Sequence, residues 1–470
     1  MYDYDLVCIG SGPAGQRAAV QAAKVGKRVA IVEKQQCVGG VCIETGTIPS
    51  KTFREAVQAV RGARAGMQAT RRIDLKTDMQ TLIRRVDAVI AKEMDVVRQQ
   101  LERNGVVMIP GKARFVDAHT IAIEGLDATT HITAAHVLVA VGTRPNKPDG
   151  IEVDRRTVVT SDDVLHLEKL PRSMVVVGGG IIGIEYACMF AALGIQVTLI
   201  DRRMRPLEFV DHEIVDELIH QMRGHHVTFR FGEAVKDVQV IESPRRLGMV
   251  MLESGKHVVA DAILFSIGRI GATADLGLES IGIEADARGR LKVDAHLRTE
   301  LPHIYAAGDV IGYPALAATS SEQGRRASCH MFDIESEPMG DHFPIGIYAI
   351  PEISHVGRTE EELTREKVPY EVGIARYREI ARGQILGDDS GLFKMLFHRE
   401  TQALLGVHCI GTGATELIHI GQAVLALGGG LQYFLRTVFN YPTLAECYKV
   451  AAFNAHNKLR MAQQVQAQLD

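Results

Sequence analysis

The stretch Tyr4-Asp5-Leu6-Val7-Cys8-Ile9-Gly10-Ser11-Gly12-Pro13-Ala14-Gly15 predicts a dinucleotide-binding fold at the start of the chain. An apolar strand runs into a G-x-G-x-x-G turn, and helical sequence follows. In such a turn Gly10 permits the tight bend, Gly12 lets backbone N–H groups approach a pyrophosphate, and Gly15 lets the helix pack against the strand. The residues expected to contact a nucleotide here are Gly10, Gly12, Pro13, Ala14 and Gly15.

A second apolar strand, Arg28 to Val32, ends at Glu33, followed by Lys34. An acidic side chain at this position of a dinucleotide fold binds a ribose hydroxyl. Glu33 and Lys34 are therefore added to the predicted site.

The same pattern occurs a second time, which predicts a second dinucleotide site. Strand Ser173 to Val177 is followed by the turn Gly178 to Gly183, and strand Gln196 to Ile200 ends at Asp201. A duplicated but inactive copy is the alternative, although this copy keeps its three glycines and its acid. Two dinucleotides most simply mean a bound flavin and a diffusible nicotinamide. The residues expected to contact the second nucleotide are Gly178, Gly180, Ile182, Gly183 and Asp201.

Composition narrows the class of protein. The 470 residues are 46% hydrophobic, and 53 basic residues nearly balance 57 acidic ones without a dense basic block, so nucleic acid is not expected as a partner. No apolar run approaches the roughly 18 residues of a membrane helix. Seven scattered cysteines, an odd number, indicate a reducing compartment, and we expect a cytoplasmic protein. The histidines lack the spacing of metal ligands, so no metal is expected.

Three further strand-and-glycine segments are expected to pass a bound nucleotide. Two buried strands end at Gly142 and Gly268, where we expect the chain to leave and re-enter the first domain. Another strand ends at Gly308-Asp309, and Asp309 is placed to accept a hydrogen bond from the ribityl chain of a flavin. The helix predicted over 315–327, which includes Ala317, offers the positive end of its dipole to a reduced flavin ring.

These motifs, with Gly39 to Lys51 and Ile350-Pro351-Glu352, resemble the pyridine nucleotide disulfide oxidoreductase family along essentially the whole chain. The resemblance implies an α/β fold: two Rossmann-like domains that bind FAD and NAD(P), and a C-terminal α+β dimerisation domain. It implies an FAD domain over 1–150 and 270–343, an NAD(P) domain over 151–269 and an interface domain over 344–470. One tightly bound FAD per subunit and a homodimer or larger homo-oligomer are expected.

Two departures from the family remove its disulfide chemistry. The family's redox pair is Cys, four residues, Cys, but here the register gives Cys42 and Thr47. The family's catalytic His before Pro-Thr is replaced by Tyr441, while Glu446 remains. Thiol exchange needs a thiolate, a second sulfur and a base that titrates near neutrality, so disulfide reduction is not expected. Cys37 and Cys42 share the same spacing, but Cys37 precedes the Gly-Gly turn and is not expected over the flavin.

The residues that would support hydride transfer remain. In the family, the counterparts of Lys51 and Glu185 form an ion pair beside the flavin nitrogen that accepts hydride. Cys42 is expected to pack against the flavin more than to act as a nucleophile, and Tyr441 either fills the space of the lost His or transfers a proton. The active-site residues expected at the flavin by resemblance are Gly40, Val41, Cys42, Thr47 and Lys51.

The same pattern resembles one subgroup, the soluble pyridine nucleotide transhydrogenases, which implies ping-pong hydride transfer from NADPH to NAD⁺ through FAD. Asp201 suits the ribose of NAD, and Arg202 and Arg203 suit the 2′-phosphate of NADP. Two other hypotheses remain open: a diaphorase that reduces quinones or dyes, and a non-catalytic flavoprotein that senses the nicotinamide pool.

Overall fold

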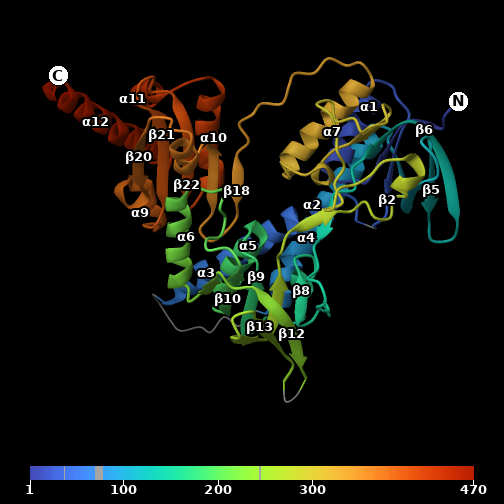
Figure 1. Cartoon of the computed structure of the whole chain (residues 1–470), viewed down its shortest axis with the longest axis horizontal. Coiled ribbons are helices and arrows are strands. Elements are labelled where there is room, and N and C mark those ends of the chain that lie inside the picture. The colour runs from blue at the N-terminus through green and yellow to red at the C-terminus, as the bar shows by residue number, and fades with distance from the viewer. Residues whose placement is uncertain (36, 69–77, 243–244, 470) are drawn as a thin grey trace. The chain divides into compact units, whose positions relative to one another are not determined.

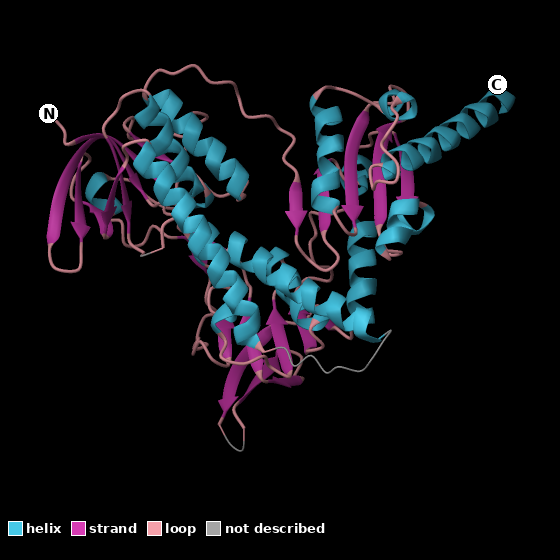
Figure 2. Ribbon diagram, turned by 180° about the vertical axis from the view of Figure 1, so that it is seen from behind, coloured by secondary structure: helices cyan, strands magenta, loops and turns pink. Residues whose placement is uncertain are grey.

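The computed structural model describes residues 1–35, 37–68, 78–242 and 245–469. The chain forms two compact units, one of residues 1–170 and 264–339 and the other of residues 171–263 and 340–470 (Figure 1). Helices and strands are mixed in both units (Figure 2), and the α/β class predicted from the sequence is confirmed. The predicted domain boundaries near 150, 269 and 343 remain a proposal.

The first unit is built on a sheet whose central strands are parallel. Strands β3, β2, β1 and β6 lie side by side in that order, and β17 pairs with β6 in parallel. Strands β5 and β4 extend the sheet antiparallel to β6. The bounds are β1 Tyr4–Ile9, β2 Val29–Glu33, β3 Val107–Pro110, β4 Lys112–Phe115, β5 Thr120–Glu124, β6 Thr129–Val139 and β17 Ile304–Ala306.

Alternation along β1 supplies both faces of this sheet. Leu6 and Cys8 pack into the core beneath helices α1, α4 and α7, while Val7 and Ile9 pack into a second core with β4 and β5. Residues 6–9 of β1 are buried and form a continuous apolar run, because helices or strands cover both faces of the parallel part of the sheet. The other elements are α1 Pro13–Lys24, α2 Val41–Glu44, α3 Thr47–Gln68, α4 Met79–Arg103, β7 Thr143–Pro145, β8 Val158–Thr160, β16 Arg269–Gly271 and α7 Ala317–Met331.

The second unit begins with a repeat of the same arrangement. Strands β9 and β11 flank β10 in parallel. A glycine turn and helix α5 connect β9 to β10, as a glycine turn and α1 connect β1 to β2 in the first unit. An antiparallel sheet of β12, β13 and β14 follows. The bounds are β9 Ser173–Val177, α5 Ile181–Ala192, β10 Gln196–Asp201, α6 His212–Gly224, β11 Thr228–Phe231, β12 Val235–Ile241, β13 Leu247–Leu252, β14 His257–Ala260 and β15 Ala262–Phe265.

The C-terminal part of the second unit is an antiparallel sheet in the order β18-β19-β22-β21-β20. Helices α10, α11 and α12 cover it, and their core includes Phe393, Phe434 and Tyr448. The bounds are β18 Ile345–Ile347, β19 Ile353–Gly357, α8 Glu360–Arg365, β20 Tyr370–Arg376, α9 Ala381–Leu386, β21 Leu392–His398, β22 Leu404–Ile410, α10 Ala414–Ala426, α11 Leu431–Arg436 and α12 Glu446–Leu469.

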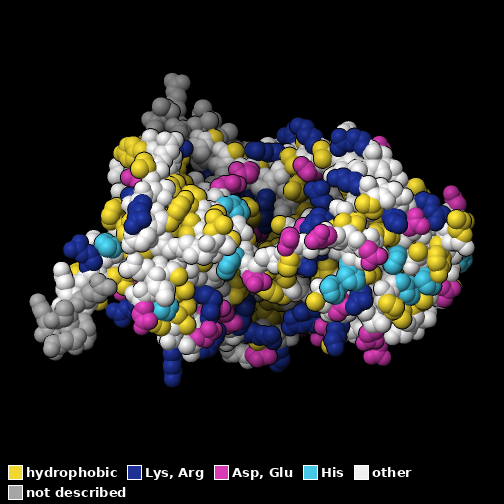
Figure 3. Space-filling model, turned by 90° about the horizontal axis from the view of Figure 1, so that it is seen from above, with side chains coloured by type: hydrophobic (Ala, Val, Ile, Leu, Met, Phe, Trp, Pro, Cys, Tyr) yellow, Lys and Arg dark blue, Asp and Glu magenta, His cyan; other side chains and the backbone are white. Residues whose placement is uncertain are grey.

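Surface charge and helix composition are unremarkable in the described part of the chain. On the face shown in Figure 3, basic and acidic side chains are interspersed. Among the described residues, no helix has both the length and the apolar composition needed to cross a membrane.

A buried ammonium group joins the two parts of the second unit. Lys394 on β21 is 1% exposed, and its Nζ lies 2.8 Å from Asp211 Oδ1 and 3.1 Å from Glu213 Oε2, at the start of α6. It also pairs with Glu360 at the start of α8. Burial alone would raise the pKa of Asp211, but the charges of His408 and Lys394 lower it below its usual value. The carboxylates of Asp211, Glu213 and Glu360 therefore surround the Lys394 ammonium group and do not enclose an empty space.

We expect Lys394→Met to destabilise the protein by about 3–5 kcal/mol, because Asp211 would stay buried without its cation. The measurement is the urea concentration at the midpoint of unfolding. Because the chain has no tryptophan, unfolding is followed by far-ultraviolet circular dichroism. Lys256→Met is the matched control: that lysine is 59% exposed and pairs with Glu233 at the surface, so its loss should cost less than about 1 kcal/mol. Equal midpoints for the two variants would contradict the proposed importance of the buried network.

Candidate cofactor and nucleotide sites

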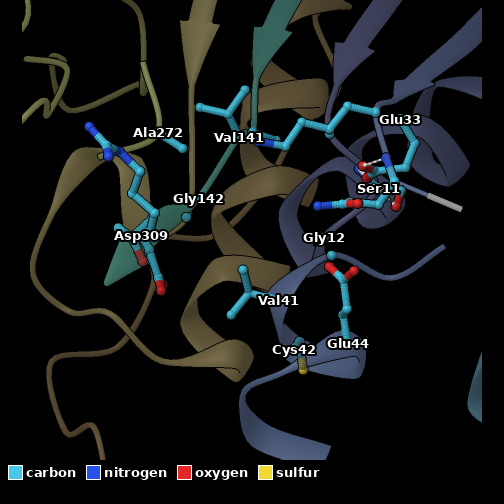
Figure 4. A pocket seen from close by; sticks show the side chains of 18 of the residues that line it. Ser11, Gly12, Glu33, Val41, Cys42, Glu44, Val141, Gly142, Ala272 and Asp309 are labelled. Atoms are coloured by element: carbon cyan, nitrogen blue, oxygen red, sulfur yellow. Dashed lines mark hydrogen bonds between the residues drawn. The ribbon is translucent and has the colours of Figure 1, made fainter. Parts of the chain in front are cut away.

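A cavity of about 510 Å³ lies in the first unit, at the carboxyl ends of its parallel strands (Figure 4). Parallel α/β sheets bind ligands at this edge. The cavity brings together most of the residues predicted for the first nucleotide. Those that line it are Gly10, Gly12, Pro13, Ala14, Glu33, Lys34, Gly40, Val41, Cys42, Thr47, Gly142, Gly308, Asp309 and Ala317.

The glycine turn is shaped by a positive φ angle at Gly10 and a close approach at Gly15. Gly10 has φ +106°, a conformation that side-chain-bearing residues rarely adopt. A Cβ atom on Gly15 would lie 2.0 Å from the Gly10 carbonyl oxygen, so Gly15 does not line the cavity but lets α1 start against the turn. A Cβ atom on Gly12 would meet nothing within 4 Å and would project into the space before the helix.

Ser11 and Glu33 hold this turn in place. Glu33 Oε2 accepts hydrogen bonds from Ser11 N at 2.9 Å and from Ser11 Oγ at 2.6 Å, and Ser11 Oγ accepts one from Gly39 N at 2.9 Å (Figure 4). The acid predicted to bind ribose therefore also fastens the glycine turn to β2. The sequence contained a signal for this contact, since Ser11 stands inside the fingerprint, but only the fold shows that the two side chains meet.

Two helix N-termini and one orphaned hydroxyl face the cavity. Helix α1 follows Gly12 and helix α7 follows Leu316, and among the described residues no side chain caps either helix. Their first-turn N–H groups can bind an anion. Thr45 Oγ1 is buried at the cavity and has no hydrogen-bond partner within the described chain. These groups suit a large polar ligand with negative charge.

Asp309 lies at the far side of the cavity from Glu33 (Figure 4). Burial raises the pKa of its carboxyl, and the charge of Arg269 and hydrogen bonds with Ser320 and Thr143 oppose that rise. The preceding Gly308 donates its N–H to the buried Gln323 Oε1 at 2.9 Å. Gln323 was missed in the sequence because it stands on α7, away from any motif.

Cys42 on α2 lies beside Thr47 and Lys51 at the start of α3. Burial raises the pKa of the Cys42 thiol, while a hydrogen bond with Thr47 and the charge of Lys51 oppose the rise. Thr47 and Lys51 are four residues apart on one helix and share a face. Lys51 itself does not line the cavity. Cys37 has a free thiol whose pKa is raised to about 11 by burial and by the charges of Glu44 and Glu33.

The segments that follow Gly142 and Gly268 lie side by side in the first unit, while the prediction that the chain leaves and re-enters the first domain there stays a prediction. Strands β7 and β16, which follow these glycines, pair antiparallel, and Asn146 N donates to Gly268 O at 3.0 Å. Gly142 lines the cavity, whereas Gly268 does not. Arg269 ties this junction together, since its side chain donates to Thr143 Oγ1 at 2.9 Å and to Asp162 Oδ1 at 3.0 Å.

Several cavity residues escaped the sequence analysis. Some of them stand inside or directly after the motifs quoted above, where the sequence analysis assigned the contact to a neighbouring residue, and the others lie outside any motif. Those with polar side chains include Ser11, Glu44, Thr45, Thr143, Arg144, Arg155, Asp162, Asp163 and His166.

In the second unit, Asp201 has the same structural role as Glu33. It is buried, and its Oδ2 accepts from Gly179 N at 2.5 Å, within the second glycine turn. Arg203 donates hydrogen bonds to the same carboxylate from Nε at 3.0 Å and from Nη2 at 2.7 Å. The neighbouring Arg202 is exposed. Burial would raise the pKa of Asp201, but its hydrogen bonds with Arg203 lower it below the usual value.

The remaining fingerprint residues open helix α5 of the second unit. Gly178 has φ +107°, Gly180 is the N-cap, and Ile182 and Gly183 follow in the first turn. Glu185 stands two residues after Gly183. It is 3% exposed and accepts a hydrogen bond from Tyr348 N at 2.8 Å. The predicted Lys51–Glu185 ion pair would join residues of different units and stays a prediction.

Tyr441 and Glu446 lie at the start of the C-terminal helix region. The Tyr441 side chain is 68% exposed, so within its own chain it fills no pocket. Glu446 begins α12, and its Oε2 is buried without a hydrogen-bond partner in the described chain. Such an orphaned oxygen is costly unless another group reaches it.

Two dinucleotide folds, each with a complete glycine turn and an acid that fastens it, define a nucleotide-binding redox protein. The family model of the pyridine nucleotide-disulphide oxidoreductases matches residues 4–324, and the model of their dimerisation domain matches residues 343–452. The chain belongs to the pyridine nucleotide-disulphide oxidoreductase family.

Similar proteins include curated soluble pyridine nucleotide transhydrogenases. Those of Mycobacterium tuberculosis (strain ATCC 25177 / H37Ra) and Chromohalobacter salexigens are 51% and 45% identical, over 99% and 98% of this chain and 99% of each relative. Among solved structures, the flavoprotein disulfide reductase RclA of Escherichia coli matches with a TM-score of 0.87 at 26% identity, covering 96% of this chain and 99% of RclA. LpdA of Mycobacterium tuberculosis matches with a TM-score of 0.88 at 26% identity, covering 95% and 98%.

We expect Ser11→Ala to weaken nucleotide binding in the first unit, because Gly39 N would lose its acceptor at a cost of about 1–3 kcal/mol and the turn would loosen. The measurement is the amount of flavin that the purified protein releases on dilution, followed by fluorescence. Thr299→Val, which removes a hydroxyl that bonds to Ile304 O away from the cavity, is the control. Equal flavin release by both variants would show that Ser11 has no special part in the turn.

Proposed function

We propose that this chain is an FAD-dependent transhydrogenase that moves a hydride from NADPH to NAD⁺ and works as a homodimer. The observation that carries the proposal is the presence of two complete dinucleotide turns in a chain whose redox pair is Cys42 and Thr47. The full-length similarity to proteins named soluble pyridine nucleotide transhydrogenase supports it.

The first cavity is the proposed FAD site. Glycine turns that a Cβ would fill, two uncapped helix N-termini and the orphaned Thr45 hydroxyl suit a long ligand with a diphosphate. FAD, when bound, would accept a hydride from one nicotinamide and return it to another, which is a ping-pong reaction. The α7 N-terminus would stabilise negative charge on the reduced cofactor.

No thiol chemistry is proposed for this site. A redox disulfide needs two sulfurs, and Thr47 offers a hydroxyl instead. The raised pKa of Cys42 also keeps its thiol protonated, whereas the nucleophile in thiol exchange is the thiolate. Cys42 would therefore pack at the flavin, and the cation of Lys51 would favour uptake of the hydride.

The second dinucleotide turn is the proposed nicotinamide site. Arg203 neutralises Asp201 through two hydrogen bonds, so a 2′-phosphate would meet a paired carboxylate rather than a bare one. The ribose hydroxyl of NAD can still bond to Asp201. A single site could then admit both nicotinamides in turn.

A homodimer is proposed from the C-terminal part. The family model of the dimerisation domain matches it, and it exposes Leu427, Val438 and Tyr441. By resemblance to the family, the C-terminal domain closes the flavin site of the neighbouring subunit. Tyr441 and Glu446 would then act at that site.

The decisive experiment is rapid anaerobic mixing of the protein with NADPH and then with a thio-analogue of NAD⁺, while flavin absorbance is recorded. We expect fast bleaching and then fast recovery with reduction of the analogue. Recovery only with a quinone or oxygen would favour a diaphorase, and a flavin that is never bleached would favour a non-catalytic sensor. Either result would overturn the transhydrogenase proposal.

We expect Cys42→Ser to retain most of the transhydrogenase activity, because the proposed hydride path does not pass through sulfur. The measurement is the steady-state rate of reduction of the NAD⁺ analogue by NADPH. Lys51→Met is the contrasting variant, since it removes the cation proposed to favour hydride uptake, and its rate should fall strongly. Loss of activity in Cys42→Ser with an unchanged flavin spectrum would mean that the thiol takes part in the reaction.

We expect Arg203→Ala to weaken NADP⁺ binding more than NAD⁺ binding, because the 2′-phosphate would lose its cation and face an unpaired Asp201. A lost bond between charged groups corresponds to about 1.5–3 kcal/mol, or roughly a 10- to 100-fold change in Kd. The measurement is calorimetric titration of the flavin-loaded protein with each nucleotide. Arg202→Ala, at an exposed neighbour, is the control, and an equal loss for both nucleotides in Arg203→Ala would contradict the assignment.

A further inference from the structure

Glu44 brings an unexpected carboxylate into the cavity assigned to FAD. It is the last residue of the short helix α2 and lines the cavity with Glu33 and Asp162. In Figure 4 its carboxylate points toward Gly12, in the turn expected to hold the diphosphate. The cavity, which must accept an anion, is also lined by the carboxylates of Asp163, Asp275 and Asp309, and such groups oppose binding unless their charge is compensated.

The backbone places Glu44 beside that turn. A Cβ atom on Gly40 would lie 3.0 Å from Gly12 Cα, so the start of α2 abuts the glycine turn. Glu44 N donates to Gly40 O at 3.0 Å, which sets the carboxylate one helical turn further along. Glu44 therefore belongs to the wall that faces the anionic part of the ligand.

The cavity carboxylates differ in how their charge is met. Asp163 accepts hydrogen bonds from Thr160, Asp275 pairs with Lys112, and Asp309 has hydrogen bonds with Ser320 and Thr143. Glu33 accepts from Ser11 and from Gln35 N at 2.9 Å, and Asp162 pairs with Arg269. Within the described chain, no hydrogen bond or ion pair to the Glu44 side chain is present. Glu44 is thus the carboxylate for which protonation costs no existing bond.

The charged neighbours of Glu44 are of both signs. Burial, then the charges of Glu33 and Asp162, raise its pKa, and the charges of Lys34 and His166 oppose the rise. From the helices packed against α2, the nearby titratable groups are Glu93 and Arg98 on α4, Lys51 on α3, and Cys37 in the connection before α2. A bound diphosphate would add negative charge and favour the protonated form further.

We propose that Glu44 binds FAD as the neutral acid: one proton is taken from solvent as the cofactor enters, and the carboxyl O–H donates a hydrogen bond to a cofactor oxygen. The inference rests on the assignment of FAD to this cavity and adds a positioning residue that controls retention of the cofactor. The diphosphate of FAD stays fully ionised near neutrality, so the proton uptake belongs to the protein.

The consequence is a pH-dependent affinity for FAD. Because the neutral acid is the binding form, affinity is highest at low pH and falls as pH rises through the pKa of Glu44 in the free protein. With one proton taken up, the fall approaches about tenfold per pH unit. It levels off above the pKa of the complex, where Glu44 is ionised in both states.

The test measures FAD release from the flavin-loaded full-length protein, diluted at a series of pH values from about pH 5 to about pH 9, the range between the unperturbed pKa values of carboxyl and phenol groups. Flavin fluorescence gives the Kd. We expect the wild-type Kd to rise with pH, and the Kd of Glu44→Gln, which keeps the shape and replaces the carboxyl O–H donor with an amide N–H donor, to stay low and flat across the range.

Two matched variants separate Glu44 from its surroundings. His166→Asn should keep the wild-type slope; if it abolishes the slope while Glu44→Gln keeps it, His166 is the titrating group and the proposal is wrong. Glu55→Gln removes an exposed charge from the neighbouring α3 and should also keep the slope. A Glu44→Gln variant that binds FAD more weakly at every pH, or a wild type whose affinity rises with added Mg²⁺, would overturn the proposal.

The outcome is independent of the proposed reaction, because no turnover is measured. A protein that bound FAD as expected but did not transfer hydride between nicotinamides would leave the Glu44 result intact. A protein that bound no FAD at any pH would overturn both the cofactor assignment and the role of Glu44.

Discussion

The close approach of Gly15 to the carbonyl oxygen of Gly10 is the constraint on which the first site depends. With 2.0 Å between that oxygen and any added Cβ atom, a side chain at Gly15 would push α1 away from the turn. The first-turn N–H groups of α1 would then leave the edge of the sheet where they converge with those of α7. A single backbone contact thus positions the electrostatic centre of the cavity.

The two dinucleotide turns are held by the same kind of hydrogen bond, but the acids that accept it have partners of different charge. In each, the acid at the end of the second strand accepts an N–H from the turn itself, Ser11 N for Glu33 and Gly179 N for Asp201. The first acid has a serine hydroxyl, a neutral group, as its second donor. The second has Arg203, which cancels its charge. Under the proposed function, this difference would suit the first site to FAD and the second to nucleotides with and without a 2′-phosphate.

The sequence predicted what is encoded locally. Strand, glycine turn, helix and acid follow one another within about 25–30 residues in such units, so the fold class, the turns and Asp309 could be placed from the chain alone. It did not predict Tyr348 N on Glu185 or Lys394 beside Asp211, because these partners are far apart in the chain and no motif connects them. Gly268 and Lys51 were also predicted to contact the cofactor, but they are not among the residues that line the cavity.

The exchange of a thiol for Thr47 changes the electrostatics as well as the count of sulfurs. In a redox pair, one sulfur must be held as a thiolate, which requires nearby positive charge to outweigh burial. Around Cys42 burial outweighs the Thr47 hydroxyl and the Lys51 cation, and the charges of Asp309 and Glu93 act in the same direction as burial. The surroundings of Cys42 therefore no longer stabilise a thiolate, so restoring a cysteine at position 47 alone would supply a second sulfur without restoring the chemistry. The positive charge that remains near Cys42 can act instead on a cofactor that accepts hydride.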